Sequence, residues 1–375
     1  MNRPGVLYVI SSGQMGRRSK LACYRRYIWT SNRYEEKRHA TEESGTISEY
    51  LLRIAGAQKR GAIRSLSQNW FNRYKENMRN LIDPHNTIEF LKTHGISAKK
   101  RYGQNFLIDR RVLDRIIEGA GITKEDIVLE IGPGIGTLTQ ALCEAAAYVI
   151  AVEIDRDMIP LLEENLAEYD NYRIINEDVL KVDPEALIRE MGFEGRTVRV
   201  AANLPYYITT PIIMQLLESG LPAKTITVMV QKEVADRMQA APGTPDYGAL
   251  SLAVQYYADA RISANVPPNC FIPRPNVDSA VITLERYETP PVEVRNEKYM
   301  FRLIRASFAQ RRKTLANSLK NDPSLGLSRG QIEDALAQMG LSADIRGERL
   351  SLQQFAALSD LLQNHEPDGS GAHCM

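Results

Sequence analysis

The sequence lacks the cysteine pattern of a metal-binding or disulfide-stabilised protein. Its 375 residues include only four cysteines, which stand far apart and form no C-x-x-C pair, and no histidine lies near them at metal-ligand spacing. This pattern excludes a zinc site and a disulfide framework. We therefore predict no bound metal, and we expect unpaired thiols at Cys23, Cys143, Cys270 and Cys374.

Long apolar segments are missing as well. No uninterrupted hydrophobic run approaches the roughly 18 residues that a membrane-spanning helix needs, and the first residues do not form the basic, apolar and small-residue succession of a signal peptide. With 43% hydrophobic and 25% charged residues, the composition is that of a globular protein. We expect a cytoplasmic protein without a membrane partner, long enough for one full-sized domain and a smaller one.

The formal net charge is only +1, but the charge is unevenly distributed. Residues 1–77 hold 15 lysines and arginines against six acidic residues, which leaves 32 against 40 in the rest of the chain. This basic extension has three interpretations: an RNA-binding arm, an Arg-rich targeting peptide, or sequence translated from a misassigned start ahead of Met78. We favour the last interpretation and expect 1–77 to be disordered or non-native. The acidic residues of this segment argue against a targeting peptide, because transit peptides are poor in acidic residues.

Between residues 127 and 285, short apolar runs alternate with amphipathic segments such as 155–169 and 210–219. Strands that are apolar on both faces, with helices between them, indicate a mainly parallel sheet that is covered on both sides. We therefore predict a doubly wound α/β domain over residues 78–288. Its expected strands are DIVLEIG, YVIAVE, YRIIN, TVRVAA, TITVMVQ and SAVITLE.

After Pro290 and Pro291 the pattern changes to helices alone. We predict a small all-helical domain over 289–365, and we expect the polar, glycine-containing end at 366–375 to be a flexible tail. The apolar spacing places its helices at 299–319, 329–339 and 352–362.

A glycine-bearing segment stands where the first predicted strand ends and a helix begins. Glycines at Gly132, Gly134 and Gly136 let the backbone approach a ligand closely, because a Cβ would occupy that space. The G-x-G-x-x-G/A fingerprint of nicotinamide enzymes is not met, since Thr137 or Thr139 stands at its last position, and this disfavours an oxidoreductase. The run E-x-G-x-G-x-G instead resembles motif I of S-adenosylmethionine-dependent methyltransferases; a tight turn without a ligand is the alternative.

Two carboxylates follow later strands at positions suited to a nucleoside. Glu153 ends the second strand 21 residues after Gly132 and can accept hydrogen bonds from both ribose hydroxyls. Asp178, after the third strand, is placed to accept from the amino group of the cofactor's adenine, although alone it would be interpreted as a solvated loop acid. Asp155 is assigned only a helix-capping role.

The tetrapeptide Asn203-Leu204-Pro205-Tyr206 directly follows the apolar fourth strand. An adenine amine is a poor nucleophile, because its lone pair is delocalised into the ring. If the Asn203 side chain and the Leu204 carbonyl accept hydrogen bonds from this amine, they favour its pyramidal form, in which the lone pair is available. Tyr206 offers a flat face on which the base can stack. An ordinary turn is the alternative, and similar tetrapeptides serve DNA adenine and protein glutamine methyltransferases.

These segments and several others make the chain similar to the ribosomal RNA adenine N6-dimethyltransferase family, and most closely to its bacterial small-subunit branch. The resemblance is dense over 99–319 and implies a Rossmann-like methyltransferase sheet, S-adenosylmethionine as the cofactor and an adenosine as the substrate. Further segments that resemble the family are KKRYGQNFL at 99–107, QKEVADRM at 231–238, YGALS at 247–251, FIPRPNVDS at 271–279 and FAQRRKTL at 308–315.

The resemblance implies roles for individual residues. Phe271 would be a second aromatic ring beside the target base, with Asn203, Leu204, Pro205 and Tyr206 as the catalytic segment; the alternative for Phe271 is a ring that anchors its proline-rich loop in the core. The implied cofactor contacts are Asn105, Leu107, Gly132, Gly134, Glu153, Asp178 and Asn203.

The resemblance also implies an RNA partner. In an otherwise acidic body, a basic helix is expected to meet phosphates, although a solvated face is the commoner role of such a run; it contains Arg302, Arg305, Arg311, Arg312 and Lys313. The implied substrate is a pair of adjacent adenosines, each dimethylated, in a hairpin near the 3′ end of small-subunit RNA, and we expect a monomer that binds the small ribosomal subunit. Methylation of large-subunit RNA, or an assembly factor with secondary methylation, are the alternatives.

Overall fold

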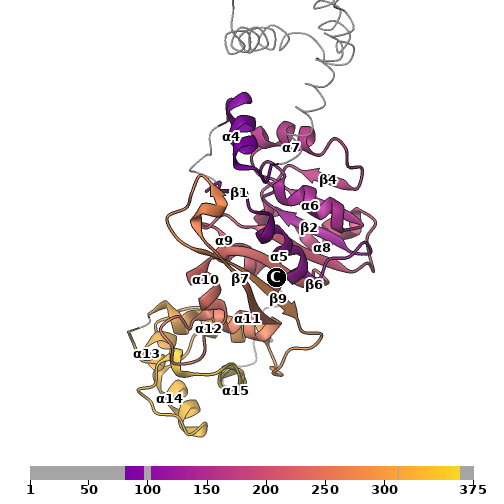
Figure 1. Cartoon of the computed structure of the whole chain (residues 1–375). Coiled ribbons are helices and arrows are strands. Elements are labelled where there is room, and N and C mark those ends of the chain that lie inside the picture. Colours follow the sequence, from indigo (N-terminus) through magenta and orange to yellow (C-terminus); the bar gives the residue numbers. More distant parts are fainter. Residues whose placement is uncertain (1–80, 97–102, 311, 364–375) are drawn as a thin grey trace, which may run out of the picture. The chain divides into compact units, whose positions relative to one another are not determined.

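The computed structural model describes residues 81–96, 103–310 and 312–363, which all belong to one compact unit of the chain (Figure 1). The predictions for residues 1–77, Met78, Arg311 and the tail at 366–375 lie outside the described residues. No helix among the described residues is long and apolar enough to cross a membrane.

A seven-stranded sheet forms the centre of the described chain, with the strand order β4-β3-β2-β5-β6-β9-β7. The pairs from β4 to β6 are parallel, and β9 runs antiparallel to both β6 and β7. This arrangement confirms the prediction of a mainly parallel sheet. The strands are β2 (Ile127–Ile131), β3 (Tyr148–Val152), β4 (Tyr172–Ile175), β5 (Val198–Asn203), β6 (Ala223–Gln231), β7 (Ala258–Val266) and β9 (Ser279–Arg286).

Three strands were not anticipated from the sequence. The edge strand β7 is only partly buried, so its residues do not form an apolar run. β1 (Phe106–Leu107) and β8 (Phe271–Ile272) are two residues long each, and they pair antiparallel with Leu107 opposite Phe271. This small ladder ties the segment before the sheet to the loop before β9.

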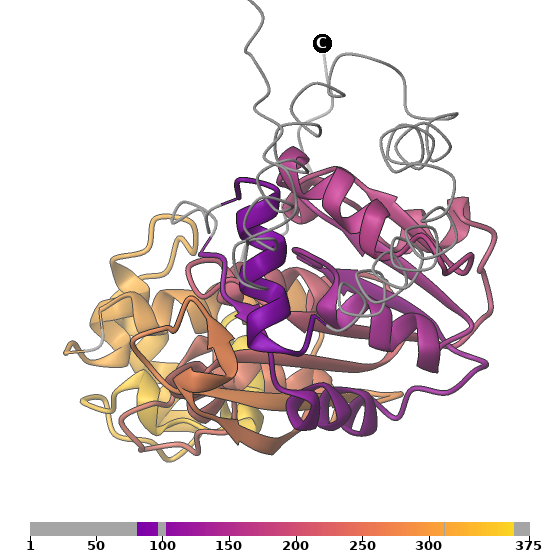
Figure 2. The ribbon, with the colours of Figure 1, turned by 45° about the horizontal axis from the view of Figure 1, so that its top comes forward.

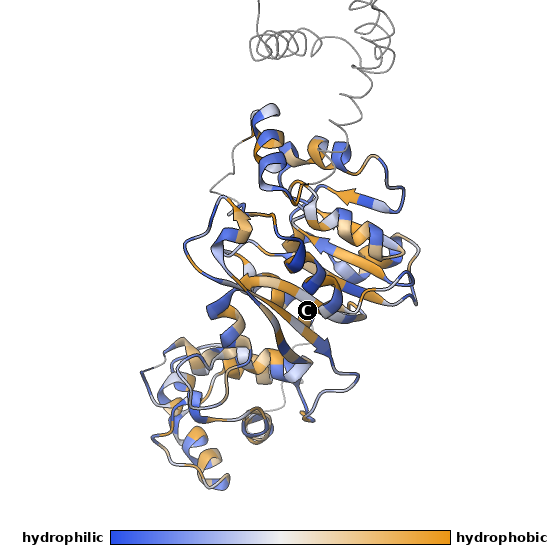
Figure 3. Cartoon of the chain, in the orientation of Figure 1, coloured by the Kyte–Doolittle hydropathy of each residue, from blue (hydrophilic) through white to orange (hydrophobic). Residues whose placement is uncertain are grey.

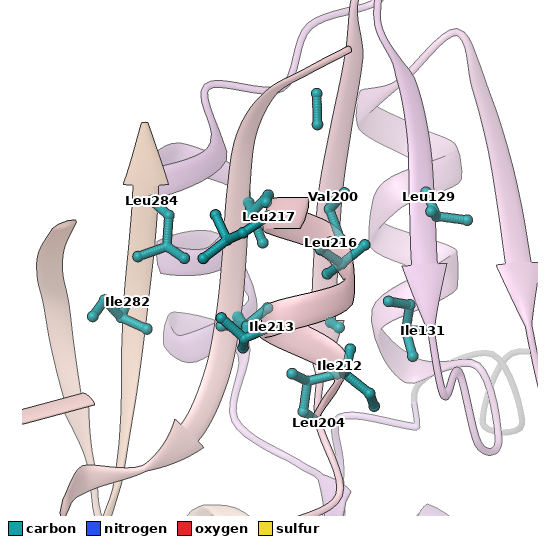
Figure 4. Close-up of a cluster of buried hydrophobic side chains, with 14 of the residues drawn as sticks. Leu129, Ile131, Val200, Leu204, Ile212, Ile213, Leu216, Leu217, Ile282 and Leu284 are labelled. Carbon is teal, nitrogen blue, oxygen red and sulfur yellow. The ribbon is translucent and has the colours of Figure 1, made fainter. Parts of the chain in front are cut away.

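Helices cover both faces of the sheet, and consecutive residues of the central strands β2 and β5 are therefore buried. These strands are mostly hydrophobic (Figure 3). α5 (Arg110–Ala120) and α6 (Thr137–Ala145) pack on one face. On the other face, α9 (Thr209–Glu218) sets four buried aliphatic side chains against β2, β5 and β9 (Figure 4). The remaining helices of that face are α8 (Pro184–Glu190), α10 (Lys232–Met238) and α11 (Ala249–Tyr257).

α5 shows how local sequence sets the helix limits. The side chain of Asp109 accepts a hydrogen bond from the Arg111 N–H and caps the first turn, and Gly121 ends the helix in the left-handed conformation with φ 62°. Between these limits, Val112, Leu113 and Ile116 bury one face against the sheet. Two further helices, α4 (Pro84–Thr93) and α7 (Ile159–Asn165), share a small core near the start of the domain.

The C-terminal region is helical, as predicted (Figures 1 and 2). Its core also contains side chains of α11. The prediction of a single helix over 299–319 is wrong, because α12 stops at Ala309 and a new helix starts after Thr314. The Thr314 side chain accepts from the Asn317 N–H and so caps that second helix. The helices are α12 (Glu297–Ala309), α13 (Leu315–Lys320), α14 (Arg329–Gln338) and α15 (Leu352–Gln363).

Candidate active site

A cleft opens where the carboxyl ends of β2, β3 and β5 meet. In an open parallel sheet this edge is the usual ligand site, because consecutive strands deliver their following loops to the same place. The cleft is lined by Gly103, Gln104, Asn105, Phe106, Leu107, Glu130, Gly132, Pro133, Gly134, Ile135, Thr137, Leu138, Glu153, Ile154, Asn203, Leu204, Pro205, Tyr206 and Tyr207.

The loop after β2 adopts a conformation that favours glycine. Gly132, Gly134 and Gly136 have φ values of 68°, 59° and 91°, all in the left-handed region. Space is also limiting, since a Cβ on Gly134 would lie 3.3 Å from the ring of Phe106 and one on Gly136 would lie 2.8 Å from Leu162. The loop therefore exposes backbone to the cleft at the start of α6, where N–H groups attract acceptors.

Glu153 is fixed by the backbone around it. Its Oε2 accepts from the Gly134 N–H at 3.1 Å, and its Oε1 accepts from the Asp155 N–H at 2.8 Å. The residue is only 5% exposed, and burial raises the pKa of its carboxyl. Each oxygen keeps capacity for a further hydrogen bond, which suits a pair of ribose hydroxyls. Asp155 caps the 3₁₀ helix η3 (Arg156–Met158), which confirms its predicted role.

Glu130 lines the cleft and is the acidic residue of the E-x-G-x-G-x-G run, but the sequence analysis gave it no individual role. It is 1% exposed, and burial raises the pKa of its carboxyl to about 8, so the group is mostly protonated at neutral pH. Its Oε2 has no hydrogen-bond partner among the described residues. The sequence could have pointed to Glu130, because it is a charged residue within the otherwise apolar run of β2.

The side chain of Asn203 is oriented by the segment before β1. Its Nδ2–H donates to the backbone carbonyl of Asn105 at 2.9 Å, so the amide oxygen is the end left for accepting hydrogen bonds. Leu204 and Pro205 are held as well. The Leu204 N–H donates to the Met229 carbonyl, and the Pro205 carbonyl accepts from the Thr209 hydroxyl at 3.1 Å. The tetrapeptide is thus a fixed element between the sheet and α9.

Tyr206 is held by a residue of β9. Its hydroxyl shares a 2.5 Å hydrogen bond with Ser279, the first residue of β9 and fully buried. Burial raises the pKa of Tyr206 above its ordinary value, so the phenol stays neutral. Sequence analysis did not single out Ser279, because its contact depends on the antiparallel return of β9 beside β6.

The cleft brings together most of the residues predicted for it, but two lie elsewhere. Asp178 caps the 3₁₀ helix η4 (Val179–Lys181), accepting from the Leu180 N–H at 3.0 Å, and does not line the cleft. Phe271 is 1% exposed and packs in the core, where it pairs with Leu107 of β1. Phe271 thus takes the core-packing position and does not itself line the cleft, although its partner Leu107 does.

The residues predicted to form one basic helix are divided between a helix and a turn. Arg302 lies on α12, and its guanidinium is 5.2 Å from the centre of the Tyr299 ring. One of its N–H groups donates a hydrogen bond to the Ser324 carbonyl. Arg305 pairs with Glu218 at 3.4 Å. Arg312 and Lys313 are exposed in the turn after α12, so the prediction that all these residues share a helix is wrong.

Two exposed arginines lie near that turn. η6 (Gly347–Arg349) packs against the end of α12, where a Cβ on Gly347 would lie 3.0 Å from Ser307. The Leu315 N–H, just after the turn, donates to the Ile345 carbonyl at 2.8 Å. Arg346 and Arg349 are exposed at the two ends of η6, with Arg346 4.0 Å from Glu348, and neither had been assigned to the RNA surface.

The described residues contain no cluster of histidine, cysteine or acidic side chains that could hold a metal ion. The parallel sheet, the glycine-bearing loop, the strand-end carboxylate and the N-x-P-Y segment together define a Rossmann-like methyltransferase that acts on an amine. A family model described as "Ribosomal RNA adenine dimethylase" matches residues 95–364. The chain belongs to this family, whose members are methyltransferases that use S-adenosylmethionine.

Named relatives agree with this assignment. The chain is 60% identical to the ribosomal RNA small subunit methyltransferase A of Lachnoclostridium phytofermentans, over 75% of this chain and 97% of that protein. It is 52% identical to the protein of the same name from Bacillus pumilus, over 76% of this chain and 98% of that one.

Two solved structures share the fold. A dimethyladenosine transferase from Plasmodium falciparum has a TM-score of 0.54 at 28% identity, covering 68% of this chain and 95% of that chain. The 23S rRNA methyltransferase ErmE has a TM-score of 0.51 at 27% identity, covering 69% and 100%. Both solved structures are named as methyl or dimethyladenosine transferases, and one of them is named for 23S ribosomal RNA.

Proposed function

We propose that this protein transfers methyl groups from S-adenosylmethionine to N6 of two adjacent adenosines in the hairpin near the 3′ end of small-subunit ribosomal RNA, dimethylating each. The observation that carries the proposal is the Asn203 amide, whose nitrogen is engaged by Asn105 and whose oxygen is left to accept from an amine in the cleft. The names of the relatives that are 60% and 52% identical support the small subunit as the source of that RNA.

The cleft fits the cofactor in its shape and its donors. Gly132 and Gly134 bring backbone without a side chain to the cleft, and Glu153 offers its carboxylate to the ribose hydroxyls. Ile154 lines the cleft and is 43% exposed, so it can cover the adenine with an apolar surface. The cofactor, when bound, supplies an electrophilic methyl group. The predicted contact of Asp178 with the adenine amine remains a prediction.

The chain's own residues act mainly on the substrate amine. The Asn203 oxygen and the Leu204 carbonyl accept its two N–H bonds, which draws the nitrogen towards a pyramidal form with its lone pair available. Tyr206, fixed by Ser279, stacks on the base. A strong general base is not required, because the amine proton becomes acidic only as the N–C bond forms. Holding both reactants in line supplies much of the rate.

RNA binding is assigned to the C-terminal surface. Arg312 and Lys313 are exposed in the turn after α12, and Arg346 and Arg349 are exposed at the two ends of η6. Such charges neutralise phosphates and release counterions, and the adenosine must then leave its stack to enter the cleft. Arg302, Arg305 and Arg311 complete the predicted RNA contacts. Action as a monomer in the cytoplasm is also part of the proposal.

Labelled S-adenosylmethionine and purified ribosomal subunits test the proposal. Unmethylated small subunits should accept label into N6,N6-dimethyladenosine, identified by mass spectrometry of the nucleosides, while large subunits lacking their own modification should not. Label in large-subunit RNA alone would favour the macrolide-resistance type of activity. If the protein instead acts mainly as an assembly factor, with methylation secondary, an inactive Asn203→Ala variant should restore small-subunit maturation in cells that lack the gene.

A further inference from the structure

Tyr207 is a large aromatic side chain exposed at the cleft. It follows Tyr206 directly, lines the cleft, and is 58% exposed. Among the exposed large hydrophobic side chains of the described chain, it has the largest exposed fraction. The proposed chemistry at Asn203 gives this ring no role, and an exposed ring beside a substrate cleft suits a stacking partner.

The Tyr207 ring has a defined position. A Cβ on Gly103 would lie 3.4 Å from its Cδ1, so one edge of the ring rests against the backbone that leads to Asn105. The turn that contains Tyr207 is closed by hydrogen bonds to the Pro205 carbonyl from the Ile208 N–H and the Thr209 hydroxyl. A ring braced in this way loses little conformational freedom when a base stacks on it.

Consecutive tyrosines contact different parts of the molecule. The Tyr206 hydroxyl reaches Ser279 on β9, whereas the Tyr207 ring lies against Gly103 on the segment before β1. Among the other aromatic residues considered for the site, Phe106 is 5% exposed and Phe271 is 1% exposed. Tyr207 is therefore the well-exposed ring among the described lining residues.

We propose that Tyr207 forms a second nucleotide subsite, where it stacks on the nucleotide next to the adenosine held by Asn203 and Tyr206. The inference rests on the proposed function, because it requires a single-stranded RNA segment extruded into the cleft. A substrate with two adjacent adenosines presents such a neighbour in each round, whichever of the two is being methylated. Stacking tolerates any base, so Tyr207 contributes affinity and positioning and makes no base-specific hydrogen bond.

The test compares Tyr207→Ala and Tyr207→Phe with the wild type on unmethylated small subunits. Loss of the ring should raise KM for the subunit about tenfold, equivalent to about 1.4 kcal/mol, while kcat changes less. Tyr207→Phe keeps the ring and should recover most of that loss. S-adenosylmethionine affinity, measured by calorimetry, should stay within about twofold in both variants.

Tyr287→Ala is the matched control. Tyr287 is also an exposed tyrosine, 41% accessible, but it follows the end of β9 opposite to Ser279 and hence lies away from the cleft. Its KM for the subunit should equal that of the wild type. If Tyr207→Ala does not bind the cofactor, Tyr207→Leu serves as the second ring-free variant.

Three results would overturn the subsite: an unchanged KM in the ring-free variant, an equal loss in Tyr207→Phe, or an equal loss in Tyr287→Ala. Failure of the proposed function would look different, because the wild-type protein would then not methylate small subunits at all. The two hypotheses therefore fail in separable ways.

Discussion

The cleft at the sheet edge and the basic surface of the C-terminal helices hold their side chains in different ways. At the cleft, Glu153, Asn203 and Tyr206 each make hydrogen bonds to fixed partners. On the C-terminal surface, Arg312 and Lys313 lie exposed in a turn. The difference follows from the two tasks, because methyl transfer requires reacting atoms aligned to fractions of an ångström, whereas attraction of phosphates depends mainly on charge at longer range.

The largest expected effect comes from removing the Asn203 side chain from the cleft. Asn203→Ala removes the oxygen that accepts from the amine, and loss of one such preorganised group reduces kcat by about 10² to 10³-fold. Cofactor affinity should stay within a few fold, since the Asn203 amide acts mainly on the amine. Methyl incorporation and calorimetry measure the two quantities. Asn265→Ala, on the exposed part of β7, is the control and should keep full activity; full activity of the Asn203 variant would remove its catalytic assignment.

The next largest effect concerns the basic residues that follow α12 in the sequence. Replacing Arg311, Arg312 and Lys313 together by alanine should weaken RNA binding and lower the slope of log affinity against log salt by up to about three. Arg305→Ala should change that slope less, because Arg305 already pairs with Glu218. Filter binding over a range of salt concentrations measures the slopes. An unchanged slope in the triple variant would refute the basic surface.

A smaller effect is expected from the support of Tyr206. Ser279→Ala frees the phenol, and we expect a several-fold lower kcat/KM with little change in cofactor affinity. Tyr206→Phe removes the same hydrogen bond, so the double variant should be no worse than the more impaired single variant. Thr283→Val is the matched control, because it breaks another buried hydroxyl pair of the sheet, with Thr227 at 3.0 Å. Additive losses in the double variant would show that Ser279 does not act through Tyr206.

The last prediction concerns the pH dependence of stability and not activity. Glu130 keeps its proton in the folded state up to pH about 8, whereas the unfolded chain ionises near its ordinary value of 4.5. Unfolding therefore releases a proton between these limits, and the free energy of unfolding should fall as the pH rises from about 5 to 8. Glu130→Gln should flatten this dependence in urea unfolding of the cofactor-free protein. An identical pH slope in both proteins would contradict the burial argument.

The parallel part of the sheet could be predicted from sequence because its strands are continuous apolar runs, each followed by a polar or glycine-bearing loop. Once such strands are parallel, their carboxyl ends meet, and this brings Gly132, Glu153 and Asn203 into one cleft. The antiparallel edge could not be predicted in the same way. β7 is half exposed, and the contact of Ser279 with Tyr206 depends on where β9 returns.

Side-chain placement outside the strand ends was harder to predict. Phe271 is placed in the core by a two-residue ladder that no periodicity reveals, while the exposed ring at the cleft is Tyr207, which follows Tyr206. Apolar spacing continues across the break between α12 and α13, so it suggested one helix where the Thr314 cap starts a second. Charge alone did not distinguish the paired Arg305 from the exposed Lys313.

A crystal structure of the protein with S-adenosylmethionine and a short RNA carrying the two adenosines tests the central claim most directly. The account predicts the cofactor against the backbone of Gly132 and Gly134, with the Asn203 oxygen within hydrogen-bond distance of an adenine amine that faces the methyl group. A cofactor bound elsewhere, or an Asn203 side chain out of reach of the amine, would contradict it.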